Sequence, residues 1–272
     1  MINVIPLIRL ALNEDIGNGD INAELVSKDK ITKATVITRE TGILCGQPWF
    51  NAVFAEIDPY VKIHWHVAEG ESIQADQLLC TLDGPARALL TGERIALNFL
   101  QTLSGTATLV HHYVEKIKNT HTQILDTRKT IPGLREAQKY AVRIGGARNH
   151  RMGLYDAFLI KENHIKACGS ITQAVLRARE MHADKPLEVE VENLQELREA
   201  LDANVKMIMC DNFSLDLLRE AVSVTQEHAQ LEASGNITLE NIAEVAATGV
   251  DFISLGALTK NVRALDLSMR IL

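Results

Sequence analysis

The segment from residue 128 to residue 151 concentrates side chains that could bind anions. Seven of its side chains are basic and only Glu136 is acidic, so its local charge is +6 in a chain of net charge −7. The basic residues are Arg128, Lys129, Arg135, Lys139, Arg143, Arg148 and Arg151. Arginine holds carboxylate and phosphate groups through paired hydrogen bonds. The segment therefore favours a small substrate that carries several negative charges.

The ends of this segment and its middle are interpreted differently. Arg128-Lys129 and His150-Arg151 flank a predicted helix, and we expect the anion site there. The basic residues inside that helix, Arg135, Lys139 and Arg143, are expected on a solvated face. Nucleic acid is not the expected anion, because aromatic residues for base stacking make up only 4% of the chain.

Two carboxylates, Glu190 and Asp211, stand near the ends of consecutive predicted strands. Such groups suit Mg²⁺, which binds one or two carboxylates together with substrate phosphates. We therefore take Glu190 and Asp211 as candidate magnesium ligands, directly or through water. A structural ion pair with a nearby lysine or arginine explains their spacing equally well.

Small polar residues end the last two predicted strands. Ser234-Gly235 ends one and Ser254, followed by Gly256, ends the other. Barrel enzymes often build a phosphate site from the loops after their final strands. These four residues are therefore candidate phosphate ligands.

Lys161 opens a second hypothesis. A lysine that ends an apolar barrel strand can form a Schiff base with a carbonyl substrate, as in aldolases. That hypothesis leaves the arginine cluster and the paired acids unexplained. A noncatalytic phosphometabolite-binding protein is a further alternative.

The elements that must position these residues alternate between apolar strands and amphipathic helices. Alternation of this kind indicates βαβ units. Charged or polar residues follow nearly every strand, which favours a barrel mouth over the one or two switch points of an open sheet. We predict a small barrel of about seven strands, including a weak one around residues 143–148. The six clearer strands are predicted at 122–127, 157–161, 187–191, 206–210, 229–234 and 251–256.

The earlier part of the chain has a different pattern. An amphipathic helix is expected in the first 15 residues, mostly strands between residues 33 and 82, and a helix over residues 85–105 that carries Arg87 and Arg94 on one face. We place the domain boundary near Ser104-Gly105, which gives an N-terminal α/β sandwich of residues 1–104 and a barrel of residues 105–272. The last helix is expected to pack back on the N-terminal domain.

Composition limits the classes of protein further. The chain has 272 residues, of which 46% are hydrophobic and 23% charged, as in globular proteins. Its net negative charge argues against a general binder of nucleic acid or anionic membranes, and no apolar run approaches the roughly 18 residues of a membrane span. The four cysteines are widely spaced, which favours reduced thiols and a cytoplasmic protein.

Several motifs resemble the quinolinate phosphoribosyltransferase family. They are DTRKTIPGLREAQKYAVRIGGARNHRMGLYDAFLIKENH, EVEVENLQEL, MCDNFS, LEASGNI and DFISLGALT, and the resemblance begins at NEDIGNGDI and continues to the end of the chain. It implies an N-terminal open sandwich, a small α/β barrel and a homodimer. It also implies transfer of a phosphoribosyl group from PRPP to quinolinate with Mg²⁺ and no organic cofactor. The products are nicotinate mononucleotide, pyrophosphate and CO₂, in the synthesis of NAD.

The resemblance assigns roles to the candidate residues. It implies that the quinolinate carboxylates are held by Arg128, His150, Arg151 and Lys161, with Arg94 reaching the partner subunit's site. It implies that PRPP and Mg²⁺ are contacted by Lys129, Glu190 and Asp211, and the phosphates by Ser234, Gly235, Ser254 and Gly256. Lys129, Glu190 and Asp211 are thereby the candidate catalytic residues.

The chain departs from the family pattern at Asn22, Ala147 and Lys260, where the family often has threonine, glycine and histidine. None of the three is a candidate core ligand, although Lys260 leaves the details of the phosphate pocket open. A related pyrophosphorylase that uses another heterocyclic acid remains the main alternative, since barrels host many chemistries.

Overall fold

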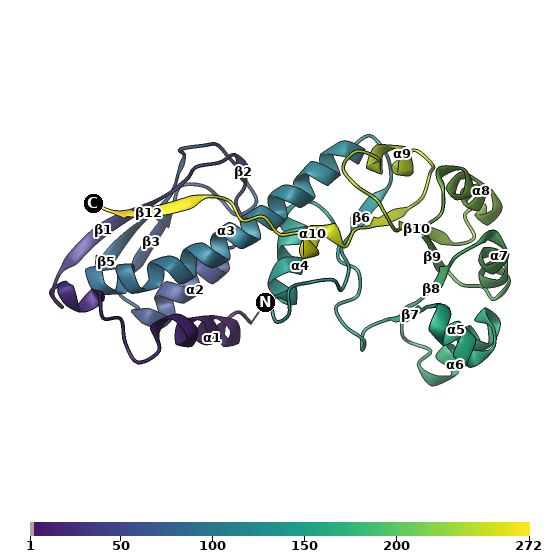
Figure 1. Ribbon diagram of the computed structural model, residues 1–272, viewed down its shortest axis with the longest axis horizontal. Helices are drawn as coiled ribbons and strands as arrows, with labels where there is room; N and C mark the ends of the chain where they lie inside the picture. Colours follow the sequence, from purple (N-terminus) through teal and green to yellow (C-terminus); the bar gives the residue numbers. More distant parts are fainter. Residues whose placement is uncertain (1–2) are drawn as a thin grey trace. The chain divides into compact units, whose positions relative to one another are not determined.

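The computed structural model describes residues 3–272, which form two compact units (Figure 1). The first unit takes the described residues up to His111, together with Ile131–Gly146 and Asn261–Leu272. The second takes His112–Thr130 and Ala147–Lys260. The predicted boundary at Ser104-Gly105 divides the sequence at a single point. The contacts between residues instead assign two later segments of the chain to the first unit.

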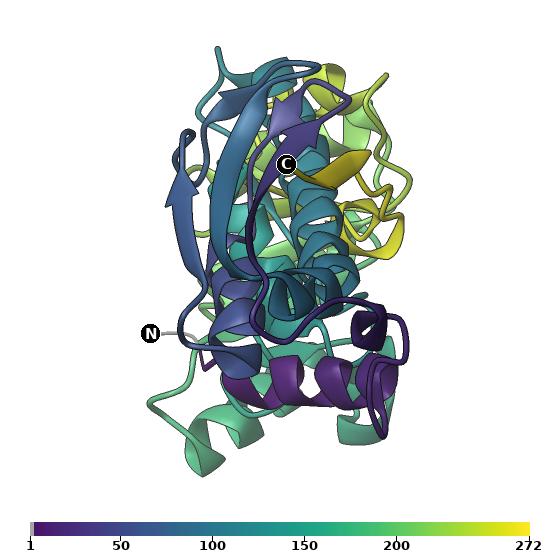
Figure 2. The same cartoon turned by 90° about the vertical axis from the view of Figure 1, so that its left-hand side faces the viewer.

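An antiparallel sheet of order β12-β1-β5-β3 organises the first unit. Alternate residues of β1 are buried from Ala34 onward, as expected when one face of a sheet covers a core. In Figure 2 these strands run over the long helix α3. The strands are β1 (Ile31–Thr38), β3 (Lys62–Trp65), β5 (Leu78–Pro85) and β12 (Leu267–Ile271), and the short pair β2 (Gly42–Ile43) and β4 (Ser72–Ile73) lies outside this sheet.

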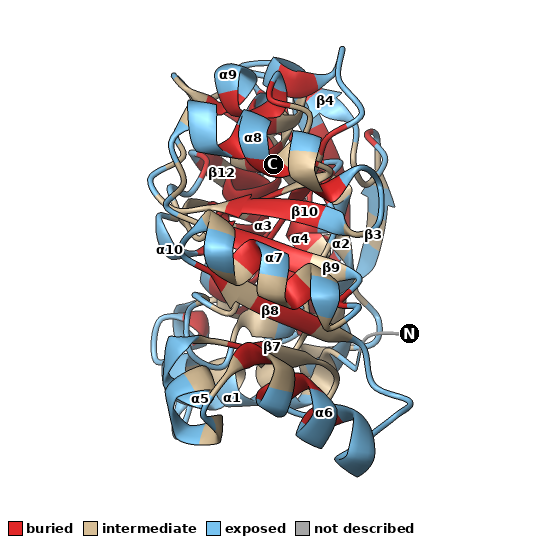
Figure 3. Ribbon diagram, turned by 90° about the vertical axis from the view of Figure 1, so that its right-hand side faces the viewer, coloured by how far each residue is buried: buried red, intermediate tan, exposed pale blue. Residues whose placement is uncertain are grey.

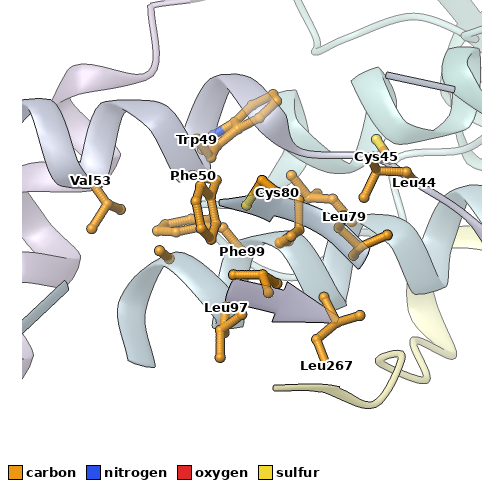
Figure 4. Close-up of a cluster of buried hydrophobic side chains, with 14 of the residues drawn as sticks. Leu44, Cys45, Trp49, Phe50, Val53, Leu79, Cys80, Leu97, Phe99 and Leu267 are labelled. Carbon is orange, nitrogen blue, oxygen red and sulfur yellow. The ribbon is translucent and has the colours of Figure 1, made fainter. Parts of the chain in front are cut away.

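Four α-helices accompany this sheet, and an aromatic cluster fills the core. Trp49, Phe50 and Phe54 are at most 1% exposed, and Figure 4 shows side chains of α2, β5 and α3 meeting around Trp49 and Phe50. Helix α2 stands in the region expected to be mostly strand. The helices are α1 (Ile5–Ile16), α2 (Gln47–Ile57), α3 (Ala86–Ile117) and α4 (Arg135–Ile144), with a short 3₁₀ turn at Ala23–Leu25.

Two expectations about the ends of elements are wrong. Helix α3 does not end at Ser104-Gly105 but continues through it. Gly105 instead lets the backbone at Arg263 lie close against α3, because a Cβ at residue 105 would lie 2.0 Å from the carbonyl oxygen of Arg263. The end of the chain returns to the first unit as strand β12 paired with β1, and not as a helix.

Lys139 also differs from expectation, because it is fully buried and not on a solvated helix face. Its neighbours Ala137, Ala141 and Val142 are buried too, so the buried arc of α4 is wide enough to include position 139. Arg143 is exposed as expected, with its guanidinium 5.7 Å from the ring centre of Tyr140.

A parallel sheet of order β6-β11-β10-β9-β8-β7 forms the second unit. It confirms the α/β class and the six clearer strands. The weak seventh strand shrinks to a single parallel bridge between Leu125 and Arg148, because residues 143 and 144 belong to α4. Among the described residues no ladder joins that bridge to β7. The strands are β6 (Gln123–Leu125), β7 (Phe158–Ile160), β8 (Leu187–Val191), β9 (Met207–Asp211), β10 (Gln230–Ser234) and β11 (Phe252–Ser254).

Helices follow most of these strands and cover the outside of the sheet. Figure 3 shows buried inner faces and exposed outer faces on α7 and α8. Ser170, Asn193 and Ser214 begin three of the helices, where each side chain accepts a backbone N–H of the first turn. The helices are α5 (Glu162–Cys168), α6 (Ile171–Met181), α7 (Leu194–Asp202), α8 (Leu215–Thr225), α9 (Ile242–Ala246) and α10 (Ala257–Lys260).

Candidate active site

A cavity of about 410 Å³ lies at the C-terminal ends of the parallel strands. Residues two apart on a strand share a face. This alternation brings Lys161, Glu190, Asp211, Ser234 and Ser254 to the cavity from five different strand ends. The lining residues are Thr127, Arg128, Lys129, His150, Arg151, Leu159, Lys161, Glu190, Met209, Asp211, Glu232, Ser234 and Ser254.

The loop before β7 supplies part of the cationic wall, and a buried acid anchors it. Asp126, fully buried, accepts hydrogen bonds from the Asn149 Nδ2 at 2.5 Å and the His150 backbone N–H at 2.9 Å. Arg151 donates from its guanidinium to the carbonyl of Ala157 at 3.1 Å. The wall is thus held in place by the protein before any substrate binds.

The pKa of Arg151 reflects its partly buried position beside a second cation. Burial lowers that pKa below its ordinary value, and repulsion by Arg128 lowers it further, against the attraction of Asp156 and Glu188. Two cations in one cavity are stabilised when an anion binds between them. A carboxylate or phosphate ligand would supply that charge.

Two further lining residues, Glu190 and Asp211, make up the acidic side of the cavity. Glu190 forms an ion pair with Lys161, and its side chain is only 11% exposed. Asp211 accepts a hydrogen bond from Asn212 Nδ2 at 2.7 Å. The structural ion pair that the sequence left open is therefore present at Glu190, and both carboxylates still face the same cavity.

Three predicted residues do not line this cavity. Gly235 lines a neighbouring cavity of about 230 Å³ and has a φ of +98°, and a Cβ there would lie 2.1 Å from Asn212 Oδ1. Gly256 makes room for Lys129, whose Cδ would lie 2.8 Å from an added Cβ. Arg94 is exposed on α3, within the first unit.

Sequence reasoning assigned no role to two buried acids, Glu188 and Glu232, which are 5% and 0% exposed. Glu188 Oε2 lies 2.8 Å from His150 Nε2, and Glu232 Oε2 lies 3.7 Å from the same nitrogen. A signal was available in the run EVEV, because strand alternation puts Glu188 on the same face as Glu190. Glu232 was visible only as a polar residue near a strand end.

The six-stranded parallel sheet and its cationic cavity define an α/β enzyme with a candidate site for small anions at the C-terminal strand ends. Comparison with family models agrees, since residues 20–104 match the N-terminal domain of quinolinate phosphoribosyl transferase and residues 106–270 match its C-terminal domain. The chain belongs to the quinolinate phosphoribosyltransferase family.

Individual relatives resemble the chain over nearly all of its length. A probable nicotinate-nucleotide pyrophosphorylase [carboxylating] of Bacillus subtilis is 42% identical, covering 95% of this chain and 90% of that protein. A mitochondrial quinolinate phosphoribosyltransferase [decarboxylating] of Nicotiana tabacum is 38% identical, covering 97% and 81%. The solved nicotinate-nucleotide pyrophosphorylase of Francisella tularensis superposes with a TM-score of 0.97 at 48% identity, covering 99% and 96%.

No helix among the described residues has the length and apolar character to span a bilayer.

Proposed function

We propose that this chain transfers the phosphoribosyl group of PRPP to quinolinate and releases pyrophosphate and CO₂, giving nicotinate mononucleotide for NAD synthesis. The observation that carries the proposal is that Arg128 and Arg151 line the same cavity as Glu190 and Asp211. Relatives that share the family and nearly the full length are named for this reaction.

The charge of quinolinate explains the cationic wall. Quinolinate is a dianion, and it must lose water beside the anionic PRPP. Arg128 and Arg151, with Lys161, supply the opposing charge where the dielectric constant is low. We assign the carboxylates to these three residues and the phosphates to Lys129, Ser234 and Ser254.

The acidic side suits the other half of the reaction. Positive charge develops at the anomeric carbon as pyrophosphate leaves, and we assign its stabilisation to the carboxylates of Glu190 and Asp211. The pyridine nitrogen attacks that carbon and becomes cationic. The cationic ring then accepts the electron pair left when the neighbouring carboxylate departs as CO₂, so no organic cofactor is needed.

The donor set fits magnesium. Asp211 and Glu190 come from neighbouring strands and offer hard oxygen ligands, although Glu190 also holds Lys161. These two residues would hold Mg²⁺, directly or through water, and the ion would neutralise pyrophosphate charge. EDTA should abolish turnover and added Mg²⁺ should restore it, whereas full turnover in EDTA would reject the metal requirement.

The nearest alternatives differ in their substrates. A panel of heterocyclic acids with PRPP tests them, with pyrophosphate and nucleotide products measured by chromatography. We expect turnover of quinolinate and little of nicotinate, which has one carboxylate fewer. Turnover of nicotinate but not quinolinate would establish the related pyrophosphorylase instead.

The Schiff-base alternative rests on Lys161. An ammonium held in an ion pair by Glu190 has no free lone pair for attack on a carbonyl. Borohydride treatment in the presence of carbonyl substrates should therefore trap no adduct at Lys161. Robust trapping there would overturn the transferase proposal.

We also propose a homodimer in which Arg94 serves the partner's site. Arg94 is exposed on α3 and lines no part of its own chain's cavity. Arg94→Ala and Lys161→Ala should each be nearly inactive, yet a mixed dimer holds one site with neither lesion and should recover about half of the wild-type activity per dimer. Verified subunit exchange without recovered activity would remove Arg94 from the partner's site.

The cellular setting is proposed to be the cytoplasm. All four cysteines, which lie within the described residues, are free thiols. Fractionation of cells with an antibody against the chain tests this location.

A further inference from the structure

Three side chains form a compact group at the floor of the cavity: His150, Glu188 and Glu232. One ligand-type atom from each lies within 4.8 Å of the others. Glu232 is fully buried and Glu188 is 5% exposed. Glu232 and His150 both line the cavity, so the group is open to whatever binds there.

The hydrogen bonds of His150 fix the position of its ring proton. Its Nδ1 accepts the backbone N–H of Arg151 at 2.7 Å, so Nδ1 carries a lone pair and no hydrogen. A neutral imidazole with that lone pair has its hydrogen on Nε2. Nε2 therefore donates to Glu188 at 2.8 Å and has no lone pair for a metal ion. The group is arranged to hold a proton and not a metal.

Glu188 and Glu232 are not equivalent in this group. Glu188 accepts the His150 N–H at Oε2, whereas its Oε1 has no hydrogen-bond partner among the described residues. Neither carboxyl oxygen of Glu232 has a hydrogen-bond partner of normal geometry among the described residues. An ionised carboxyl group in that position would be desolvated and would lie beside a second carboxylate, which strongly favours the protonated form.

The pKa of Glu232 agrees with this asymmetry. Burial raises it well above the ordinary value and the charge of Glu188 raises it further, whereas Ser254 and the charge of Lys161 oppose the shift. Charged and titratable groups reach Glu232 from several elements. They are Lys161 after β7, Glu188 on β8, Cys210 on β9 and His150 in the loop before β7.

A protonated Glu232 would serve the proposed reaction, on which this inference rests, in two ways. A neutral Glu232 does not repel the dianionic quinolinate, as a carboxylate would. When CO₂ leaves, its bonding electron pair stays on the ring carbon, and that carbon must gain a proton. Arg151, Lys161 and Glu232 line the same cavity, so a ring whose carboxylates bind the two cations shares that cavity with the acid.

We propose that Glu232 is a catalytic acid that protonates the ring carbon after decarboxylation. The O–H bond of Glu232 breaks, a C–H bond forms with the electron pair released by CO₂, and Glu232 becomes a carboxylate. A proton from water restores the acid when the product leaves. Lys161 and Glu190 keep their ion pair throughout.

Glu232→Gln tests the proposal because it keeps the neutral shape and removes the acidic proton. Pyrophosphate and nicotinate mononucleotide are measured separately in a single quenched turnover with PRPP, quinolinate and Mg²⁺. We expect pyrophosphate release to persist, nicotinate mononucleotide formation to fall about 100-fold, and quinolinate mononucleotide to accumulate. Glu244→Gln, the same change on the exposed face of α9, should match the wild type.

Two outcomes of this turnover would overturn the role of Glu232. One is nicotinate mononucleotide formed at the wild-type rate. The other is an equal fall of pyrophosphate and nicotinate mononucleotide in a variant whose circular dichroism matches the wild type, which would place the loss at phosphoribosyl transfer and not at protonation. A wild type that releases no pyrophosphate with quinolinate would reject the proposed function itself.

Infrared spectroscopy of the substrate-free protein tests the protonated state without any turnover. At neutral pH the wild type should show a carboxylic-acid C=O band that shifts in D₂O and is missing from Glu232→Gln. Absence of that band from the wild type would overturn the proposal even if the variant fails to fold.

Discussion

The two units of this chain use their interiors differently. The core of the first unit is built from large apolar side chains such as Trp49, Phe50 and Phe54. The interior of the second unit's sheet holds Glu188 and Glu232, and Asp126 is buried in the loop after β6. Buried acids stabilise a fold poorly unless they are paired. The difference indicates that the first interior is organised for stability and the second for chemistry.

The largest expected effect on stability comes from the apolar core. Phe50→Ala should lower the free energy of unfolding by about 3–5 kcal/mol, because it empties a fully buried aromatic site. The folded fraction should keep its activity, since Phe50 lies in the first unit's core. Chemical denaturation followed by circular dichroism measures the loss, and Phe50→Leu serves as the milder control. A loss below about 1 kcal/mol would contradict the packing argument.

A change at Asp211, on the acidic side of the cavity, should lower activity and leave stability nearly unchanged. Asp211→Ala should lower PRPP-dependent turnover on the order of 100-fold, while the free energy of unfolding changes by less than about 1 kcal/mol. Asp211→Asn keeps an acceptor for Asn212 and removes only the charge, so it should be nearly as inactive. Initial rates over a range of PRPP and Mg²⁺ concentrations test both variants. Wild-type activity of Asp211→Asn would mean that the charge is not required.

The pH dependence of stability gives the smallest and most specific effect. Burial holds the pKa of Glu232 above its ordinary value of 4.5, so the folded chain keeps a proton that the unfolded chain releases. The stabilisation is complete below pH 4.5 and is lost as the pH rises toward the pKa of the folded state. Stability of the wild type relative to Glu232→Gln should then fall by up to about 1.4 kcal/mol per pH unit. If the free energy of unfolding changed with pH in the same way for both proteins, the pKa of Glu232 would not be raised in the folded chain.

Strand ends were the part of the site that the sequence predicted well. Polar residues such as Lys161, Glu190 and Asp211 follow apolar strands, and a parallel sheet brings such ends to one edge. The sequence predicted a domain boundary at Ser104-Gly105, where the two family models also meet, but α3 continues through Gly105, because glycine serves close approaches as well as turns. The burial of Lys139 and Glu232 depends on which neighbours pack over them, and local spacing does not contain that information.

The central claim is that Arg128 and Arg151 bind the two carboxylates of quinolinate. Titration calorimetry of Arg151→Ala with quinolinate and, separately, with PRPP and Mg²⁺ tests it directly. Quinolinate binding should weaken by about 2–5 kcal/mol, since a desolvated carboxylate loses its partner, while PRPP binding stays within about 0.5 kcal/mol of the wild type. Arg143→Ala, an exposed arginine outside the cavity, should bind both ligands normally. Weakened PRPP binding with unchanged quinolinate binding in Arg151→Ala would contradict the account.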